Sequence, residues 1–179
     1  AFDYRAFAAA GRAFIEYGAA GAYDLTTLTR IGRELVGSDD ATIPVAPYPP
    51  AFLLLLVPFG LLPFIPGFFA WFLINLVGTL YSIHSLAARF TSHRRKIVLL
   101  GVLALPVLDG LLVGQPIALL LLGMSGLHRN LESGRDGRAG LWGGLLLFKP
   151  QYVVLLTLVL AMKRRWRALG GFAVSGAGL

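Results

Sequence analysis

The stretch that decides the fold is AFLLLLVPFGLLPFIPGFFAWFLINLVGTLYSIHSLAA, residues 51–88, followed directly by RFTSHRRK, residues 89–96. The first segment runs for 38 residues without a charged side chain, and the second carries four positive charges. A charge at the centre of a bilayer costs about 2.5 to 3.5 kcal/mol on insertion scales, so charges collect outside the lipid. This layout predicts a polytopic, all-α membrane protein.

The composition agrees with that prediction and excludes several other classes. Apolar residues make up 56% of the 179 positions and charged residues 14%, which a soluble domain would rarely show. The chain contains no cysteine, and its three histidines stand far apart. We therefore expect no disulfide, no thiol chemistry, no bound metal and no other cofactor.

The net charge of +7 is distributed unevenly along the chain. Residues 1–50 sum to −2 and residues 51–179 to +9. All Lys and Arg residues of the second part except Lys149 fall in three short clusters, at 89–96, 129–138 and 163–167. Such clusters are typical of the cytoplasmic loops of membrane proteins, so the basic excess reflects topology and does not indicate nucleic-acid binding.

Two basic clusters on the same side of a membrane must be joined by an even number of crossings. Pro106, Asp109-Gly110 and Gly114-Gln115-Pro116 interrupt the run between the first two clusters, and Lys149-Pro150 interrupts the run between the last two. Both breaks are therefore expected on the outer side. The expected helices are 68–88, 97–108, 116–128, 139–148, 151–162 and 168–179.

The acidic residues 1–50 are predicted to form an external loop with helices parallel to the membrane. One amphipathic helix is expected to end at Gly18. A second is expected to begin with Asp24 as its cap and to end at Gly37.

Residues 51–66 leave the number of crossings open. This segment is short for a full span and contains Pro58 and Pro63, so we expect an interfacial or re-entrant segment before a transmembrane bundle of residues 67–179. In the alternative, residues 51–88 cross the membrane twice, and residues 1–50 lie on the same side as the basic clusters.

Counting the membrane crossings in this way places four polar side chains on the outer side: Asp3, Asp109, Gln115 and Lys149. Helices of about 10 to 13 residues reach only about 15 to 20 Å, short of the ~30 Å core, so their outer ends are expected to border an outward-opening cavity. Lys149 could bind a lipid-linked phosphate there, or could extend toward the interface. Asp3 could take a proton from a hydroxyl as a general base, or could be a solvated loop residue. Asp109 and Gln115 could also serve only to end a helix and to satisfy backbone groups at the break.

Several short motifs follow one another along nearly the whole chain. They are Asp3-Tyr4, Gly21-Ala22-Tyr23-Asp24, Tyr48-Pro49-Pro50, Gly114-Gln115, Ala139-Gly140, Lys149-Pro150 and Arg164-Arg165-Trp166-Arg167. In their order and spacing they resemble glycosyltransferase family eighty-seven, the polyprenol-phosphate-mannose-dependent α-mannosyltransferases of the GT-C superfamily.

The resemblance implies a GT-C-like fold with short broken helices and a catalytic aspartate in the first external loop, the position of Asp3. It implies a metal-independent, inverting transfer of a hexose such as mannose from a polyprenyl-phosphate donor to a hydroxyl of a glycan or glycolipid acceptor. The reaction would take place at the outer face of a bacterial plasma membrane. Lys149 would contact the donor phosphate, Gln115 and Asp109 are further substrate-binding candidates, and Tyr48 would shape the loop near the lipid.

Other interpretations stay open at this point. A transporter or flippase-like protein would use broken helices and Lys149 to move an anionic lipid or solute, and a structural membrane subunit would need no site at all. Because the chain begins without methionine and stops inside an apolar run, we also expect a piece of a longer protein. The missing helices would hold further contacts, so this piece alone is expected to be inactive.

Overall fold

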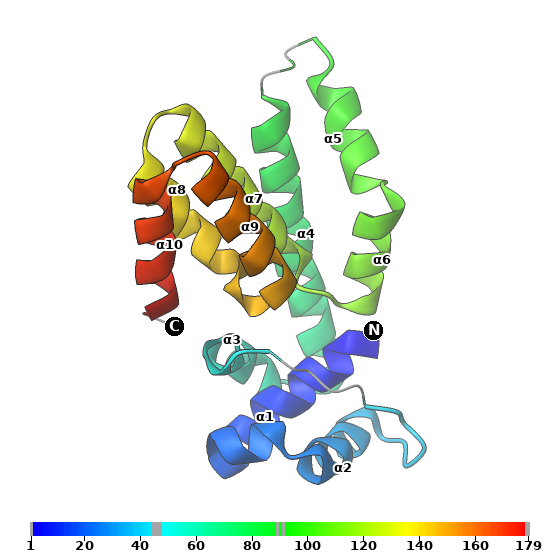
Figure 1. The fold of residues 1–179 in the computed structure, drawn as a ribbon. Coiled ribbons are helices and arrows are strands. Elements are labelled where there is room, and N and C mark those ends of the chain that lie inside the picture. The colour runs from blue at the N-terminus through cyan, green and yellow to red at the C-terminus, as the bar shows by residue number, and fades with distance from the viewer. Residues whose placement is uncertain (1, 44–47, 89, 91, 178–179) are drawn as a thin grey trace. The chain divides into compact units, whose positions relative to one another are not determined.

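The computed structural model describes residues 2–43, 48–88, 90 and 92–177, which form helices joined by short connections, with no strand among them (Figure 1). The all-α prediction is confirmed for this part of the chain. Arg89 of the first basic cluster and residues 178–179 of the last expected helix lie outside the described residues. The elements are α1 (Phe2–Tyr23), α2 (Leu25–Val36), α3 (Pro50–Gly60), α4 (Phe64–Ala87), α5 (Arg94–Val102), α6 (Leu105–Val113), α7 (Ile117–Glu132), α8 (Asp136–Gly143), the 3₁₀ helix η1 (Gly144–Phe148), α9 (Pro150–Met162) and α10 (Trp166–Ala177).

The helix expected over 97–108 and the break after it differ from the structure. The chain bends by 50° between α5 and α6 and then continues as helix through Asp109 and Gly110 to Val113. The cause is Pro106, because its ring lacks an N–H and clashes with the carbonyl four residues earlier, that of Val102 at the end of α5. Asp109 therefore lies inside a helix and not at a turn.

The contacts divide the chain into two compact units. Unit 1 comprises Ala1–Ile74 and Asp109–Gln115, and unit 2 comprises Asn75–Leu108 and Pro116–Leu179.

In unit 1, α1 packs against both α2 and α3. The cap signals of α2 are confirmed: the Asp24 carboxylate accepts a hydrogen bond from the Thr27 backbone N–H at 2.7 Å, and the helix ends at Gly37. The backbone of α1 is interrupted at Gly18, where the sequence predicted its end. The buried face of α2 is formed by Leu28 and Ile31, which are 3% and 2% exposed.

Helices α1 and α3 approach each other at two glycines. A Cβ atom on Gly11 would lie 2.3 Å from the carbonyl oxygen of Leu56, and one on Gly60 would lie 2.3 Å from the backbone nitrogen of Arg12. The two backbones are therefore in direct contact. Tyr4 and Phe7, at most 1% exposed, fill the interior beside this crossing and fix the helix that carries Asp3.

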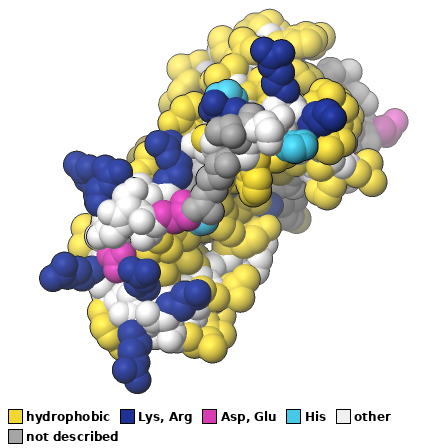
Figure 2. All heavy atoms as spheres, turned by 90° about the horizontal axis from the view of Figure 1, so that it is seen from above, with side chains coloured by type: hydrophobic (Ala, Val, Ile, Leu, Met, Phe, Trp, Pro, Cys, Tyr) yellow, Lys and Arg dark blue, Asp and Glu magenta, His cyan; other side chains and the backbone are white. Residues whose placement is uncertain are grey.

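In unit 2, the three basic connections lie at one end. Arg94 at the start of α5 and Arg129 near the end of α7 both bond to the C-terminal part of α4, and Arg165 between α9 and α10 pairs with Asp136 at the start of α8 at 3.1 Å. Figure 2 looks onto this end and shows Lys and Arg side chains gathered there. The described residues of the three clusters thus share one end, as the crossing argument predicts.

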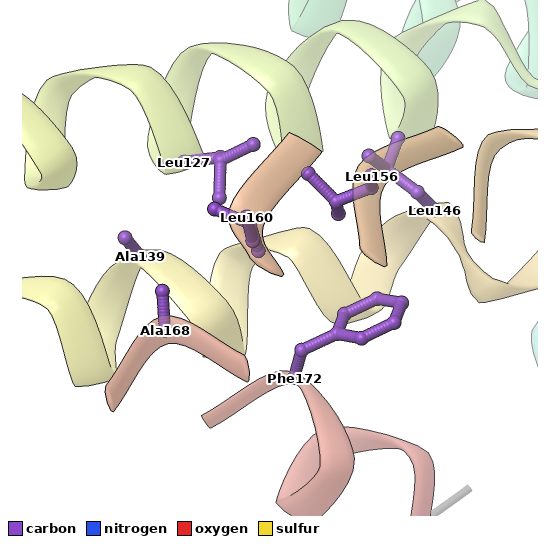
Figure 3. Packing of buried hydrophobic residues seen from close by; sticks show 7 residues of the cluster. All are labelled: Leu127, Ala139, Leu146, Leu156, Leu160, Ala168 and Phe172. Carbon is purple, nitrogen blue, oxygen red and sulfur yellow. The ribbon is translucent and has the colours of Figure 1, made fainter. Parts of the chain in front are cut away.

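An apolar cluster holds the helices of unit 2 together. Side chains from α7, α8, η1, α9 and α10 point toward one another (Figure 3). Ala139 on α8 and Ala168 on α10 are both fully buried, and their small size lets these helices come close. The cluster consists of Leu127, Ala139, Leu146, Leu156, Leu160, Ala168 and Phe172.

Polar contacts join α4 to α7 in unit 2. The Asn75 side-chain oxygen accepts a hydrogen bond from the Ala118 N–H at 3.1 Å, and Arg129 donates to the Ser85 hydroxyl at 2.8 Å. The earlier residue of α4 contacts the earlier residue of α7, and the later contacts the later. The two helices therefore run in the same direction. Helix α7 thus begins at the end of unit 2 opposite to the basic connections, where Ala118 contacts Asn75.

Within the part of the chain that the structure describes, α4 is long and apolar enough to cross a membrane. The bent pair α5 and α6 passes the same test only if the two helices form one span, and α3 and α9 are shorter apolar helices. The number of crossings expected from the sequence therefore stays a prediction.

Candidate functional site

Asp3 and Gln115, two of the predicted site residues, meet in unit 1. Asp3 lies in the first turn of α1, where the positive end of the helix dipole attracts its negative charge. The Gln115 Nε2 group donates a hydrogen bond to Asp3 Oδ2, although the two residues are 112 positions apart. Both side chains are half-buried. A donor on one oxygen restricts rotation of the carboxylate, so Asp3 is held in a defined orientation.

The turn that carries Gln115 is held in place by its neighbour Gly114. The buried Trp71 indole donates a hydrogen bond to the Gly114 carbonyl at 2.8 Å. Gly114 has a φ of 95°, and a Cβ atom there would lie 2.8 Å from the Cβ of Tyr4. Only glycine meets both conditions, because L side chains rarely adopt such a φ and the space is already filled. The motif Gly114-Gln115 thus brings an amide side chain against the start of α1.

Tyr4, the residue after Asp3, anchors the start of α1. Its ring is fully buried, with centroid distances of 5.4 Å to Phe64, 5.5 Å to Phe68 and 6.3 Å to Trp71. These tilted and edge-on contacts are the favourable arrangements of aromatic pairs. Burial also raises the pKa of the Tyr4 hydroxyl, so it stays protonated. The aromatic cluster fixes the backbone that presents Asp3.

Tyr48 belongs to the same site. Its ring lies 5.3 Å from that of Phe7 and 4.6 Å from that of Phe52, and its carbonyl accepts a hydrogen bond from the Tyr23 hydroxyl at 2.6 Å. Burial and the negative charge of Asp3 raise the pKa of Tyr48 to about 12. At neutral pH Tyr48 is therefore an uncharged phenol near the Asp3 carboxylate, able to donate a hydrogen bond.

Asp109 is not brought into this group in the way that the sequence predicted. It is exposed within α6, and the turn that follows is made by Gly114 and Gln115. That turn is closed by two hydrogen bonds to the Gly110 carbonyl, from the Gly114 N–H at 3.1 Å and the Gln115 N–H at 2.7 Å. Gly110 is buried inside α6 and does not end it.

Lys149 belongs to unit 2, where it joins η1 to α9. Its backbone is extended, its side chain is half-buried, and its Nζ lies 5.9 Å from the centroid of the Phe148 ring. Helix α9 runs about 20 Å from this point to the basic connection that begins at Lys163. Lys149 thus lies at the end of unit 2 opposite to the basic connections.

Three residues that take part in the site were not predicted as functional candidates from the sequence: Trp71, Tyr4 and Tyr23. Trp71 is the single tryptophan of the uncharged segment 51–88, and a buried indole needs a hydrogen-bond acceptor. That need signals a polar contact, but the sequence does not identify the acceptor. The Tyr23 hydroxyl lies in the motif Gly21-Ala22-Tyr23-Asp24, which was noted only as a marker of resemblance.

The comparisons with known proteins bear on these residues. Residues 47–179 match the sequence model of a family described as Glycosyltransferase family 87. No curated protein and no solved structure matches the chain. The matched residues include Tyr48, Gln115 and Lys149 and begin after Asp3. The match favours sugar transfer over transport or a purely structural role.

Replacing Trp71 by phenylalanine should destabilise the protein. The Gly114 carbonyl would lose its buried donor, at a cost of about 1 to 3 kcal/mol in the free energy of unfolding. Thermal unfolding of the purified protein in detergent should show a midpoint lowered by several degrees. The matched control is Trp166→Phe, because Trp166 is 65% exposed and should tolerate the change. Equal midpoints for the two variants would contradict the role given to Trp71.

Replacing Tyr48 by phenylalanine should change how stability depends on alkaline pH. The folded state raises the pKa of Tyr48 from its ordinary 10.0 to about 12, so its contribution is complete below pH 10 and is lost as the pH rises toward 12. The free energy of unfolding of the variant should therefore fall less steeply over this range than that of the wild type. Chemical unfolding in detergent at a series of alkaline pH values tests this, and parallel profiles would count against a buried Tyr48 hydroxyl.

Proposed function

This chain belongs to glycosyltransferase family 87, a family of membrane proteins, and on that premise we propose that Asp3 is the general base of its sugar transfer. The observation that carries the proposal is the hydrogen bond from Gln115 to Asp3, made between residues far apart in the sequence. A long-range donor that orients a single carboxylate is what a positioned base requires.

The proposed reaction transfers a hexose, with mannose as the favoured sugar, from a polyprenyl-phosphate donor. Asp3 takes the proton of an acceptor hydroxyl as the hydroxyl oxygen attacks the anomeric carbon. The bond between that carbon and the phosphate oxygen breaks, the polyprenyl phosphate leaves, and the configuration at the carbon is inverted. A single carboxylate base suffices for this displacement, without a metal in the proposed mechanism.

The residues around Asp3 have distinct roles in this proposal. Gln115 holds one oxygen of the Asp3 carboxylate by a hydrogen bond. The other oxygen is thereby held in a defined direction, and in this proposal it takes the proton of the acceptor hydroxyl. Tyr48, protonated and close to Asp3, can donate a hydrogen bond to a sugar oxygen. A glycan or a glycolipid supplies such hydroxyl groups. Asp109 is exposed in the helix that leads to the Gly114-Gln115 turn and stays a secondary candidate for acceptor binding.

Lys149 is the proposed partner of the donor phosphate. Negative charge grows on the bridging oxygen as the sugar leaves, and a fixed ammonium group stabilises this charge in the transition state. The place of Lys149 at the start of α9, away from the basic connections, supports a role at the other membrane face. Lys149 and Asp3 are in different units, and their approach during the reaction is part of the proposal.

The proposed orientation follows from the charges of unit 2. Basic connections are retained on the cytoplasmic side during insertion, so the end of unit 2 that carries Lys149 would face outward. A donor built on a long polyprenol would reach this end from within the bilayer. In this proposal the enzyme is a multi-pass protein of the plasma membrane with its reaction at the outer face.

Changing Asp3 to asparagine in the full-length protein should reduce sugar transfer by about 10² to 10⁴-fold, the usual contribution of a general base. Asparagine keeps the size of the side chain, so binding of the lipid donor should remain nearly intact. Transfer of radiolabelled sugar from a polyprenyl-phosphate donor measures the first effect, and equilibrium binding of the donor measures the second.

Two further variants sharpen the test of Asp3. Gln115→Leu removes the orienting donor and should lower transfer by about 10 to 100-fold, less than Asp3→Asn. Asp39→Asn makes the same chemical change at an exposed loop residue and should have no effect. Retention of transfer by Asp3→Asn, or an equal loss in Asp39→Asn, would refute the assignment of the base.

Changing Lys149 to glutamine should lower kcat by about 10² to 10³-fold, because the departing phosphate loses a stabilising charge. Lys149→Arg keeps the charge and should retain part of the activity. Lys163→Gln, at the other end of α9, is the matched control and should leave the rate unchanged. If Lys149→Gln transfers sugar at the wild-type rate, the phosphate has another partner.

A further inference from the structure

Unit 2 contains a groove between α4 and α5 at its basic end that the proposed reaction does not use. Its volume is about 510 Å³. One part is aliphatic and the other part is polar and cationic. The aliphatic wall is formed by Leu80, Val98, Leu99 and Val102, and the polar end by His84, Arg94 and Arg95.

We infer that this groove binds an anionic phospholipid of the surrounding membrane, with the phosphate at Arg94 and Arg95 and an acyl chain along the aliphatic wall. This site is separate from Asp3 and Lys149. It requires only that α4 lies in the membrane, and it does not depend on the identity of the sugar or of the acceptor.

The aliphatic wall fits an acyl chain. Leu99 is 60% exposed and Leu80 is 39% exposed, so both leave apolar surface uncovered in the described part of the chain. A chain lying along this wall would bury apolar surface from two helices at once. A free phosphate ion would leave the wall uncovered, which is why a lipid is the better occupant.

The polar end fits a phosphate. Arg94 contacts His84 through Nη2, and its Nε is buried without a hydrogen-bond partner among the described residues. Arg94, Arg95 and Lys96 all lie in the first turn of α5, at the positive end of the helix dipole, where positive charge is unfavourable. A phosphate bound there would relieve this repulsion and could accept paired hydrogen bonds from a guanidinium group.

The position of the groove agrees with such a lipid. It lies where the membrane-spanning candidate α4 reaches the basic connections, the level at which headgroups are expected. Basic pockets between helices on the cytoplasmic side of membranes are suited to anionic headgroups. Along α5, the cationic residues come first, at the basic connection, and the aliphatic residues come next. A lipid has the same order, with its phosphate at the membrane surface and its acyl chain deeper in the bilayer.

Photo-crosslinking in bilayers tests the inference. The full-length protein is reconstituted in phosphatidylcholine containing a few per cent of a phosphatidylglycerol probe with a diazirine in its acyl chain. Irradiation should label the peptides that carry Leu80 and Leu99. In the double variant Arg94→Gln, Arg95→Gln this labelling should fall by at least about fivefold, the preference that a single surface charge confers. Mass spectrometry of the digested protein measures the labelling at each peptide.

The controls separate a specific site from general attraction to a basic surface. Arg164→Gln, Arg167→Gln removes two exposed charges from another basic connection and should leave labelling of the groove unchanged. Arg94→Lys, Arg95→Lys should restore most of it. A phosphatidylcholine probe with the same diazirine should label the groove weakly and equally in all variants. Equal labelling by both probes, or labelling of the wild type that Arg94→Gln, Arg95→Gln does not reduce, would overturn the inference and indicate that a protein segment or neutral lipid covers the groove.

Discussion

The hydrogen bond from the Trp71 indole to the Gly114 carbonyl connects two parts of unit 1 that are distant in the sequence. Residues 109–115 belong to this unit although a long stretch of unit 2 separates them from residues 1–74. The bond is buried, so neither partner can exchange it for water, and the Gly114 backbone leaves no room for a side chain against Tyr4. The contact between Gln115 and Asp3 depends on this arrangement.

Unit 2 is organised by charge. Its basic connections share one end, while Lys149 and the start of α7 lie at the opposite end. A membrane protein gains its orientation from such an asymmetry, because charged connections are costly to move across lipid. The same asymmetry separates the basic end, where headgroups are expected, from the end that carries Lys149, the proposed partner of the donor phosphate. Family membership indicates sugar transfer, and the charge asymmetry of unit 2 is the observation on which the proposed orientation rests.

The local features of this fold could be predicted from the sequence, and the long-range ones only in part. The all-α class and the two ends of α2 follow from short signals, the Asp24 cap and Gly37, which act within one turn of helix. Asp109-Gly110 was a false signal for a helix end, because Gly110 is buried inside α6 and Pro106 sets the bend instead.

The site shows the same division between local and distant information. Counting crossings predicts that Asp3 and Gln115 lie on one side of the membrane, yet no local pattern shows that their side chains touch. Trp71 was missed because its acceptor is 43 residues away and is a backbone carbonyl, which leaves no mark in the sequence. That Lys149 and Asp3 act in one reaction stays a prediction, because the two residues belong to different units.

The glycine contact between α1 and α3 limits the motions open to the first of these helices. With backbone against backbone at Gly11 and Gly60, a slide of α1 by one residue, about 1.5 Å, would drive a neighbouring Cβ into the main chain of α3. Rotation of α1 about its own axis meets the same obstacle. Any movement of α1 within unit 1 must therefore move α3 with it. In such a movement the backbone that carries Asp3, the proposed base, keeps its place relative to α3.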